Sequence, residues 1–297
     1  MTLRRIAALA LAAAACAKGV NPESSPGSVD QAVFDPSAGA LPLPNDLALL
    51  PQAVLGLPAG IERDLAEAFQ VMGGFPNDQE VPITIDFARE TVAGGGPSAS
   101  APDLDLGSIG PATLLVLKVS GLGATPVPYE VAGYAKAATK GTLTLRTPPN
   151  AQQARLWEAG AQYVVAVRGG ASGVKTAGGG TVYPSPVMYL LLQNKNLADP
   201  ANQALLPDPS AGFLLEQIRQ NYLPAFTLVD AAFPSRGLAV LQTFKIAPAR
   251  THVVLDQAAG IVPFPSNFLL DYGKSPPRVV SNPAFGPAAA GLATLDG

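Results

Sequence analysis

The sequence predicts a mainly β protein, an antiparallel β-sandwich with one helical insertion, followed by the truncated start of a second copy. Short apolar or alternating segments follow one another, separated by turns and without regular intervening helices. Gly and Pro number 30 each among 297 residues, whereas charged residues make up only 14%. This composition is typical of many short elements joined by turns. A long internal repeat predicts the second copy.

Residues 34–49 (FDPSAGALPLPNDLAL) are repeated without a gap as residues 255–270 (LDQAAGIVPFPSNFLL). The identical pairs are Asp35/Asp256, Ala38/Ala259, Gly39/Gly260, Pro42/Pro263, Pro44/Pro265 and Leu49/Leu270. A spacing of about 220 residues is too long for a solenoid repeat and indicates a repeated domain. We therefore expect residues 31–248 to form one domain and residues 249–297 to begin a second, with the natural protein continuing further.

Within the first domain, alternation or short apolar runs predict strands at residues 83–87, 113–119, 141–146, 161–168, 186–192 and 238–246. Apolar residues at helical spacing predict helices at residues 62–72, 151–157 and 209–226. The last is the helical insertion near 210–226, which Ser210 can cap and Pro224 can end. Residues 34–49 are expected to be a lead-in strand or a covered loop, and residues 93–110 and 121–128 to be loops or turns.

Residues 1–16 have the pattern of an export signal. Arg4 and Arg5 precede an apolar run, residues 6–15, that is too short to span a bilayer. Ala13-Ala14-Ala15-Cys16 resembles a bacterial lipobox, which implies that Cys16 is lipidated and becomes the first residue of the mature protein. The motif usually has Leu where this chain has Ala13, and cleavage at an Ala-x-Ala site by the ordinary signal peptidase is the alternative.

Residue 17 is Ala, not the Asp that accompanies retention in the inner membrane. The resemblance therefore implies the outer membrane or the cell surface, with the protein held to the membrane through its N-terminal lipid. Residues 17–30, which contain Ser, Pro and Gly, are expected to be a tether. The net charge of −3 and the lack of a basic run beyond the first residues argue against a nucleic-acid partner.

The sequence contains few residues of the types that catalysis commonly uses. A single Cys and a single His, His252, exclude most metal and thiol chemistry. A hydrolase needs a Gly-x-Ser-x-Gly elbow with His and an acid, and the nearest approach, around Ser172, lacks one residue between Ser172 and Gly173. We interpret this stretch as a hairpin loop, assign no catalytic residue and expect no cofactor.

Three further groups are candidate ligand sites. Asp103 and Asp105 alternate as calcium ligands do, but no later bidentate Glu follows, and a solvated loop is favoured. Residues 178–180 (GGG) resemble a phosphate cradle without its Lys-Ser/Thr, and a turn is favoured. Three aromatic residues could line a carbohydrate site, but in a sandwich they are more often core: Trp157, Tyr163 and Tyr189.

The ordered series VFDPSAGALPLPNDLAL, MGGFP, ITIDF, AGAQYVVAVRGG, SPVMYLLL, LLEQIRQNYLPAF and LAVLQTFKI resembles the N-terminal region of the bacterial virulence-factor lipase family. That region is similar to the Ig-like domains of large bacterial surface proteins. The resemblance implies an Ig-like sandwich with a helical insertion on an exported, often lipid-anchored protein. In the lipases the catalytic domain lies further along the chain.

Three functions remain open at this point. The favoured one is a non-catalytic, surface-anchored Ig-like module that presents or spaces other domains. The second is the N-terminal part of an extracellular lipase or esterase whose catalytic domain is not in these residues. The third is a carbohydrate- or protein-binding surface module. A downstream Gly-x-Ser-x-Gly elbow would establish the second, whereas further Ig-like copies would support the first.

We predict that Cys16 is lipidated, because it follows an apolar run and three small residues. Mass spectrometry of the mature N-terminus should find a lipid-modified Cys16 as the first residue. A mature chain that starts at Lys18 or later, or a free thiol at Cys16, would contradict this.

Overall fold

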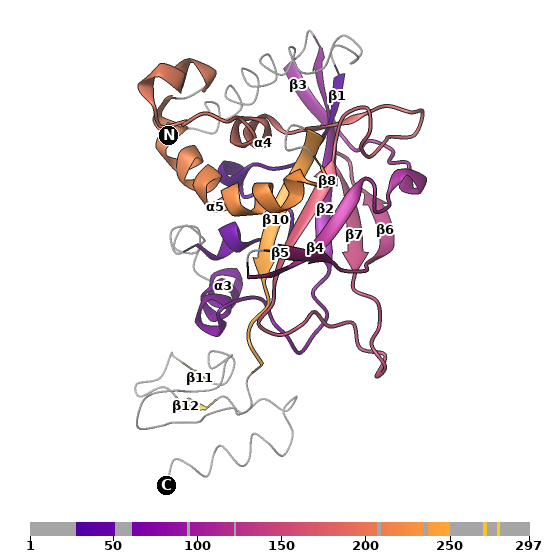
Figure 1. The fold of residues 1–297 in the computed structure, drawn as a ribbon, viewed down its shortest axis with the longest axis vertical. Coiled ribbons are helices and arrows are strands. Elements are labelled where there is room, and N and C mark those ends of the chain that lie inside the picture. Colours follow the sequence, from indigo (N-terminus) through magenta and orange to yellow (C-terminus); the bar gives the residue numbers. More distant parts are fainter. Residues whose placement is uncertain are drawn as a thin grey trace. The chain divides into compact units, whose positions relative to one another are not determined.

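The computed structural model describes residues 28–50, 61–93, 96–121, 123–206, 209–233, 237–249, 270–271 and 278–279. The chain divides into two compact units, residues 1–248 and 249–297. In the second unit, β11 (Leu270–Asp271) pairs antiparallel with β12 (Arg278–Val279). The first unit contains the other elements (Figure 1).

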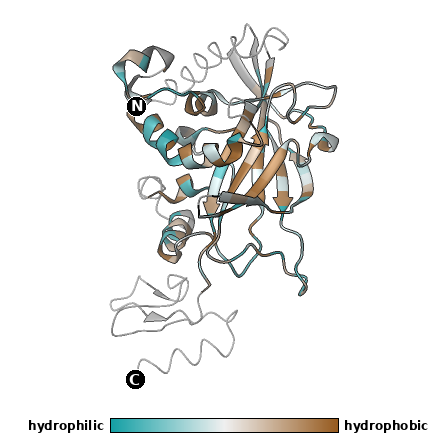
Figure 2. Cartoon of the chain, viewed as in Figure 1, coloured by the Kyte–Doolittle hydropathy of each residue, from teal (hydrophilic) through white to brown (hydrophobic). Residues whose placement is uncertain are grey.

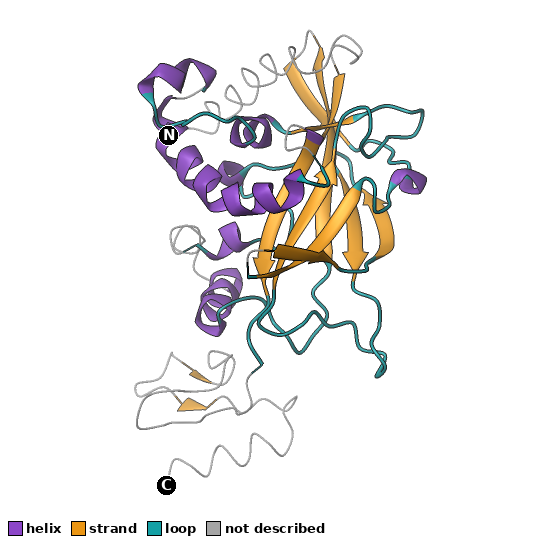
Figure 3. Cartoon of the chain, in the orientation of Figure 1, coloured by secondary structure: helices purple, strands orange, loops and turns teal. Residues whose placement is uncertain are grey.

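The first unit consists mostly of strands in two sheets, with few helices, which confirms the mainly β prediction (Figure 3). The larger sheet has the order β6-β7-β2-β1-β9, with β3 also paired to β2, and the smaller has the order β10-β8-β4-β5. The strands are β1 (Ser28–Ala32), β2 (Ile83–Ala93), β3 (Gly96–Ser100), β4 (Leu114–Ser120), β5 (Gly123–Pro126), β6 (Glu130–Lys136), β7 (Gly141–Arg146), β8 (Gln162–Arg168), β9 (Val182–Pro184) and β10 (Leu238–Lys245). Every pair is antiparallel except β1 with β9, which is parallel.

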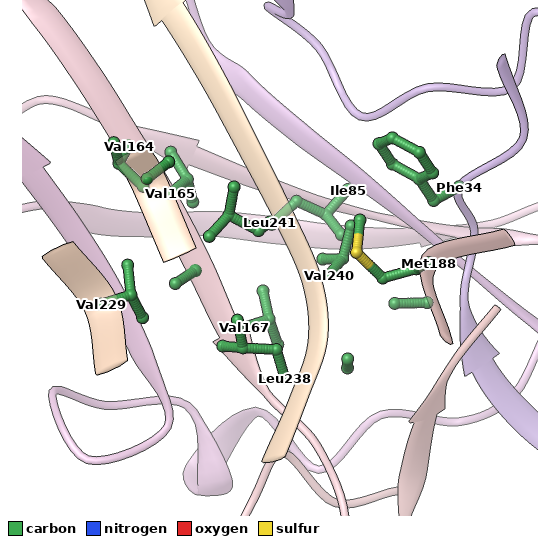
Figure 4. Packing of buried hydrophobic residues seen from close by; sticks show 14 of the residues in the cluster. Phe34, Ile85, Val164, Val165, Val167, Met188, Val229, Leu238, Val240 and Leu241 are labelled. Atoms are coloured by element: carbon green, nitrogen blue, oxygen red, sulfur yellow. The ribbon is translucent and has the colours of Figure 1, made fainter. Parts of the chain in front are cut away.

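One hydrophobic cluster joins the two sheets, with contributions from Ile85 of β2 and Val165 of β8. Seven consecutive residues of β10 are buried, so this strand is covered on both faces. Figure 4 shows β10 passing between Val229 and Ile85, with Leu241 and Val240 on its two sides. Apolar residues follow the strands, whereas polar residues lie on the outer side of the helical layer (Figure 2).

The helices of the first unit are α3 (Ile61–Met72), α4 (Pro186–Leu191) and α5 (Gly212–Asp230), with short 3-10 turns at Pro36–Ala38, Asp46–Leu49, Leu106–Ser108, Pro200–Leu205 and Pro209–Ala211. The predicted helix at 209–226 is present, but two details were wrong. Ala211, not Ser210, is the N-cap residue and makes no side-chain cap bond, and Pro224 lies inside the helix. Burial of Phe226 and Val229 beyond the proline favours continuing the helix over ending it at Pro224.

The strand predicted at 186–192 is wrong, because these residues form α4. Ser185 caps the helix by accepting a hydrogen bond from the Met188 amide at 3.2 Å, and Pro186 occupies the first turn, where its missing N–H costs nothing. An apolar run of this length does not distinguish a buried strand from a buried helix. The sequence signal for a helix was Ser185 followed by Pro186 at its start.

The short helix predicted at 151–157 is also wrong. Asn150 Oδ1 accepts hydrogen bonds from the amides of Gln152 and Ala154, both at 2.9 Å, and Gln153 has φ 62°. The Asn150 side chain thus accepts from backbone amides, which takes the place of the backbone hydrogen bonding of a helix. The segment is therefore a turn that leads to the buried Trp157.

The Gly- and Pro-rich stretches expected to be loops contain two strands, β3 and β5, and β6 follows the second stretch. β1 begins at Ser28, within the stretch expected to be a tether, and it lies inside the sheet between β2 and β9. β3, β5 and β6 each pair with a strand next to them in the chain, whereas β1 pairs with the more distant β2 and β9. Strand formation depends on these partners, so local residue preference is a weak guide to it.

The Glu216–Arg219 ion pair on α5 generates a stability prediction. Both side chains are buried and paired at 2.7 Å, and Glu216 also accepts from the Leu197 amide at 2.9 Å. Glu216→Gln should lower the free energy of unfolding by about 3 kcal/mol, because Arg219 then keeps a buried charge without its counter-ion. The exposed pair Arg63–Glu67 provides the control, since Glu67→Gln should cost less than about 0.5 kcal/mol.

Arg219 lowers the pKa of Glu216 to about 2. A depressed folded-state pKa adds stability that is present above the ordinary value of 4.5 and is lost as the pH falls towards about 2. Urea titrations across this range should therefore show the difference between the native protein and Glu216→Gln shrinking as the pH falls. A difference that is constant with pH would contradict this role.

Candidate functional site

A largely buried polar cluster joins the lead segment, residues 34–49, to β10 and α5. We call it the lead-segment clamp, and its side chains are Asn45, Asp46, Tyr222, Gln242 and Thr243. Its bonds link residues 177–199 positions apart in the chain. On either side of it, Leu43 pairs with Thr84 of β2, and the Ser185 hydroxyl donates to the Phe34 carbonyl oxygen at 2.8 Å.

Asn45 is fully buried at the centre of the clamp. Its Oδ1 accepts hydrogen bonds from the Leu47 amide at 3.0 Å and from the Tyr222 hydroxyl at 3.1 Å. The neighbouring Pro44 carbonyl oxygen accepts from Gln242 Nε2 at 3.1 Å. Burial raises the pKa of Tyr222 above its ordinary value, so its hydroxyl stays protonated and remains a donor.

Asp46 holds the same segment to the end of β10. Its carboxylate accepts from Thr243 Oγ1 at 2.9 Å, from the Lys245 amide at 3.0 Å and from Gln162 Nε2 at 3.4 Å. Burial raises the pKa of Asp46, and these hydrogen bonds oppose the rise only in part. All three donors belong to the protein itself, so the carboxylate acts as a structural acceptor.

The stretch around Ser172 forms a turn that follows β8. Gly170 has φ 69°, and a Cβ at Gly173 would lie 2.2 Å from the Arg168 carbonyl oxygen, so the glycines serve the tight turn. Ser172 is exposed at its tip. His252 lies outside the described residues, as does Cys16.

Asp103 and Asp105 are each engaged by protein groups. Asp103 Oδ1 pairs with Lys136 Nζ at 2.5 Å, and Asp105 Oδ1 accepts from the Gly107 amide at 3.0 Å, capping a 3-10 turn. Among the described residues, no group of three or more His, Cys, Asp or Glu side chains could hold a metal ion. Residues 178–180 belong to a turn that the Thr176 amide closes by donating to the Gly180 carbonyl oxygen at 2.8 Å.

The structure places two of the three aromatic candidates in the core. Trp157, Tyr163 and Phe244 form one cluster, with the Tyr163 and Phe244 rings stacked at 5.2 Å. Trp157 Nε1 donates to the Val81 carbonyl oxygen at 2.7 Å, so the indole N–H is also hydrogen-bonded within the protein. Tyr189 is half-buried on α4.

A shallow apolar groove of about 450 Å³ lies between residues 114–116 of β4 and residues 126–129. The Tyr129 hydroxyl at its wall donates to the Leu114 carbonyl oxygen at 3.1 Å. Three prolines contribute to the lining, namely Pro111, Pro126 and Pro128, and they bring no N–H donor. The groove therefore offers apolar surface and no reacting group.

The chain matches no protein-family model, no curated protein and no solved structure. Within the parts of the chain that the structure describes, none of the helices has both the length and the apolar character needed to cross a bilayer. Sequence reasoning missed the lead-segment clamp. Its signal was the polar pair Asn45-Asp46 inside an otherwise apolar stretch that occurs twice.

The two central residues of the clamp should differ in their contributions to stability. Asn45→Ala leaves the buried Tyr222 hydroxyl and the Leu47 amide without their acceptor, and it should lower the free energy of unfolding by about 2–4 kcal/mol. Asp46→Asn retains one acceptor oxygen for the Lys245 amide, turns an amide N–H2 towards Thr243, whose hydroxyl can rotate to accept, and removes a charge that burial disfavours. It should therefore cost only about 1 kcal/mol.

Urea unfolding midpoints of the two variants measure this difference. Gln152→Ala, at an exposed turn position, is the control and should leave the midpoint unchanged. A larger loss for Asp46→Asn than for Asn45→Ala would show that the aspartate charge, not the asparagine acceptor, holds the lead segment.

Proposed function

We propose that this chain is an exported, lipid-anchored cell-surface protein whose first unit is a non-catalytic Ig-like module that presents or spaces other domains. One observation carries the proposal: the chain enters and leaves this unit at opposite ends. Export and anchoring are supported by the sequence of residues 1–16. The two sheets with a shared core support the Ig-like assignment.

The entry and the start of β10 lie at the same end of the unit. Asp30 of β1 pairs with Val182 of β9, and Val182 accepts a hydrogen bond from the Gly170 amide. The neighbouring Gly169 amide donates to the Gly237 carbonyl oxygen at 2.6 Å, immediately before β10. Both β1 and β10 therefore begin beside β9.

The exit lies at the far end. β10 has eight residues, which carry the chain about 26 Å along the strand axis. In Figure 1, β1 (indigo) enters at the top, and β10 (orange) runs from there to the bottom, where the chain leaves the unit. A unit of this geometry lengthens the path between whatever precedes it and whatever follows it, which is the requirement for a spacer.

The side-chain chemistry points the same way. Asp46, Asp103 and Asp105 accept hydrogen bonds from the protein's own groups, and Trp157 and Tyr163 belong to the core. These residues support the architecture of the unit. We therefore favour a role in position and distance over a role in catalysis.

An epitope-tag experiment tests this proposal. A tag placed after Gly297 should be labelled by antibody on intact Gram-negative cells that produce the chain. Deleting residues 28–248, so that residue 27 joins residue 249, should reduce the labelling because the tag then lies closer to the membrane. Cys16→Ala should release the tagged chain into the soluble fraction.

The control is the amount of tag detected after cell lysis, which should be equal for the full chain and the deletion. Equal labelling of intact cells with and without residues 28–248 would refute the spacer role. Retention of Cys16→Ala in the membrane fraction would refute lipid anchoring.

A further inference from the structure

We infer that the first unit bears mechanical load between its entry at Ser28 and its exit at Pro248, an inference that rests on the proposed spacer function. A module between a membrane anchor and another domain is pulled at these two points. The inference concerns how the hydrogen bonds of the unit are oriented with respect to that pull.

The entry strand is held on both sides. β1 pairs with β2 on one side and with β9 on the other. Asp30 of β1 also forms a two-bond ion pair with Arg89 of β2, at 2.7 and 2.8 Å. Ladder hydrogen bonds between antiparallel strands run perpendicular to the strands, so a pull along β1 loads them together instead of opening them one at a time.

The exit is held beyond the end of β10. The Ala247 amide donates to the Phe75 carbonyl oxygen at 2.8 Å, and the Ala247 carbonyl oxygen accepts from the Gly160 amide at 3.0 Å. Asn77 Nδ2 donates to the carbonyl oxygens of Ala247 and Pro248, at 3.0 and 2.9 Å. These contacts fix the last residues of the unit to two separate loops.

The close approach at the exit depends on a glycine. A Cβ at Gly74 would lie 2.4 Å from the Lys245 carbonyl oxygen, and Gly74 has φ 151°. The Phe75 amide then donates to that same carbonyl oxygen at 2.8 Å. Gly74 therefore allows the loop after α3 to close on the end of β10.

The lead-segment clamp connects the segment that follows the entry strand to the end of the exit strand. The lead segment follows β1 in the chain, and its Asp46 is bonded to Thr243 and to the Lys245 amide of β10. Load therefore passes from β1 through residues 34–46 into β10 along a short bonded path. The unit does not need to transmit it through the helices.

Single-molecule force spectroscopy on the full chain tests this inference. Cys16→Ser removes the only native cysteine. Ser28→Cys with Ala249→Cys then attaches the handles at entry and exit. Glu130→Cys with Arg146→Cys attaches them to two paired, exposed residues at the open end of the β6–β7 ladder, so that the same unit is peeled open bond by bond. Unfolding at a given force should be at least about tenfold slower in the entry–exit geometry.

Equal or faster unfolding in the entry–exit geometry would overturn the inference. Asn77→Ala should speed unfolding in the entry–exit geometry and change it by less than about twofold in the peeling geometry, where the exit contacts carry no load. Equal acceleration in both geometries would show a general loss of stability and would also overturn the assigned load path. Gln152→Ala is the matched control and should change neither rate.

Because this experiment uses purified protein, its outcome is independent of export and lipidation. A unit that resists force but does not reach the cell surface would refute the proposed function and leave the load-bearing geometry in place. A surface-exposed spacer that unfolds equally in both geometries would do the reverse.

Discussion

The fold of the first unit depends on one constraint: hydrogen bonds to residues near its end hold its opening residues in place. Asn45 is bonded to Tyr222, 177 positions later, and Asp46 to Lys245, 199 positions later. The lead segment therefore has no stable place until α5 and β10 have formed. Contacts of such long range require a large loss of chain entropy before they are gained, so a unit of this kind folds slowly and cooperatively. The same contacts connect the segment that follows the entry strand to the strand that leads to the exit.

Burial of β10 on both faces explains why α5 is required. The strand contacts β1 and β9 of the larger sheet and also contacts α5, so part of its buried surface would lose its cover if α5 were absent. Exposed apolar strand surface favours association with other chains. Glu216 and Arg219 hold α5 in this place by tying it to the Leu197 amide. The helical insertion thus stabilises the strand that ends the unit.

Several polar and aromatic side chains of the first unit serve its fold. The carboxylates of Asp46 and Asp103 accept hydrogen bonds from neighbouring side chains or amides, and the buried aromatic rings pack on one another. What distinguishes the unit is the direction in which it carries the chain, and that direction is a property of the strand order.

The sequence by itself determined the mainly β character of the protein and several strands almost to the residue, because β7 and β8 carry a clear apolar pattern over most of their length. It also revealed the repeat that contains Asn45 and Asp46. The tertiary structure alone decided that residues 186–191 are a helix, that β5 and β6 are strands, and that α5 continues through Pro224. Local pattern reports which residues are apolar, whereas the partner that pairs with or covers them is set by the fold: β4 and β7 pair with β5 and β6, and α5 packs against β10.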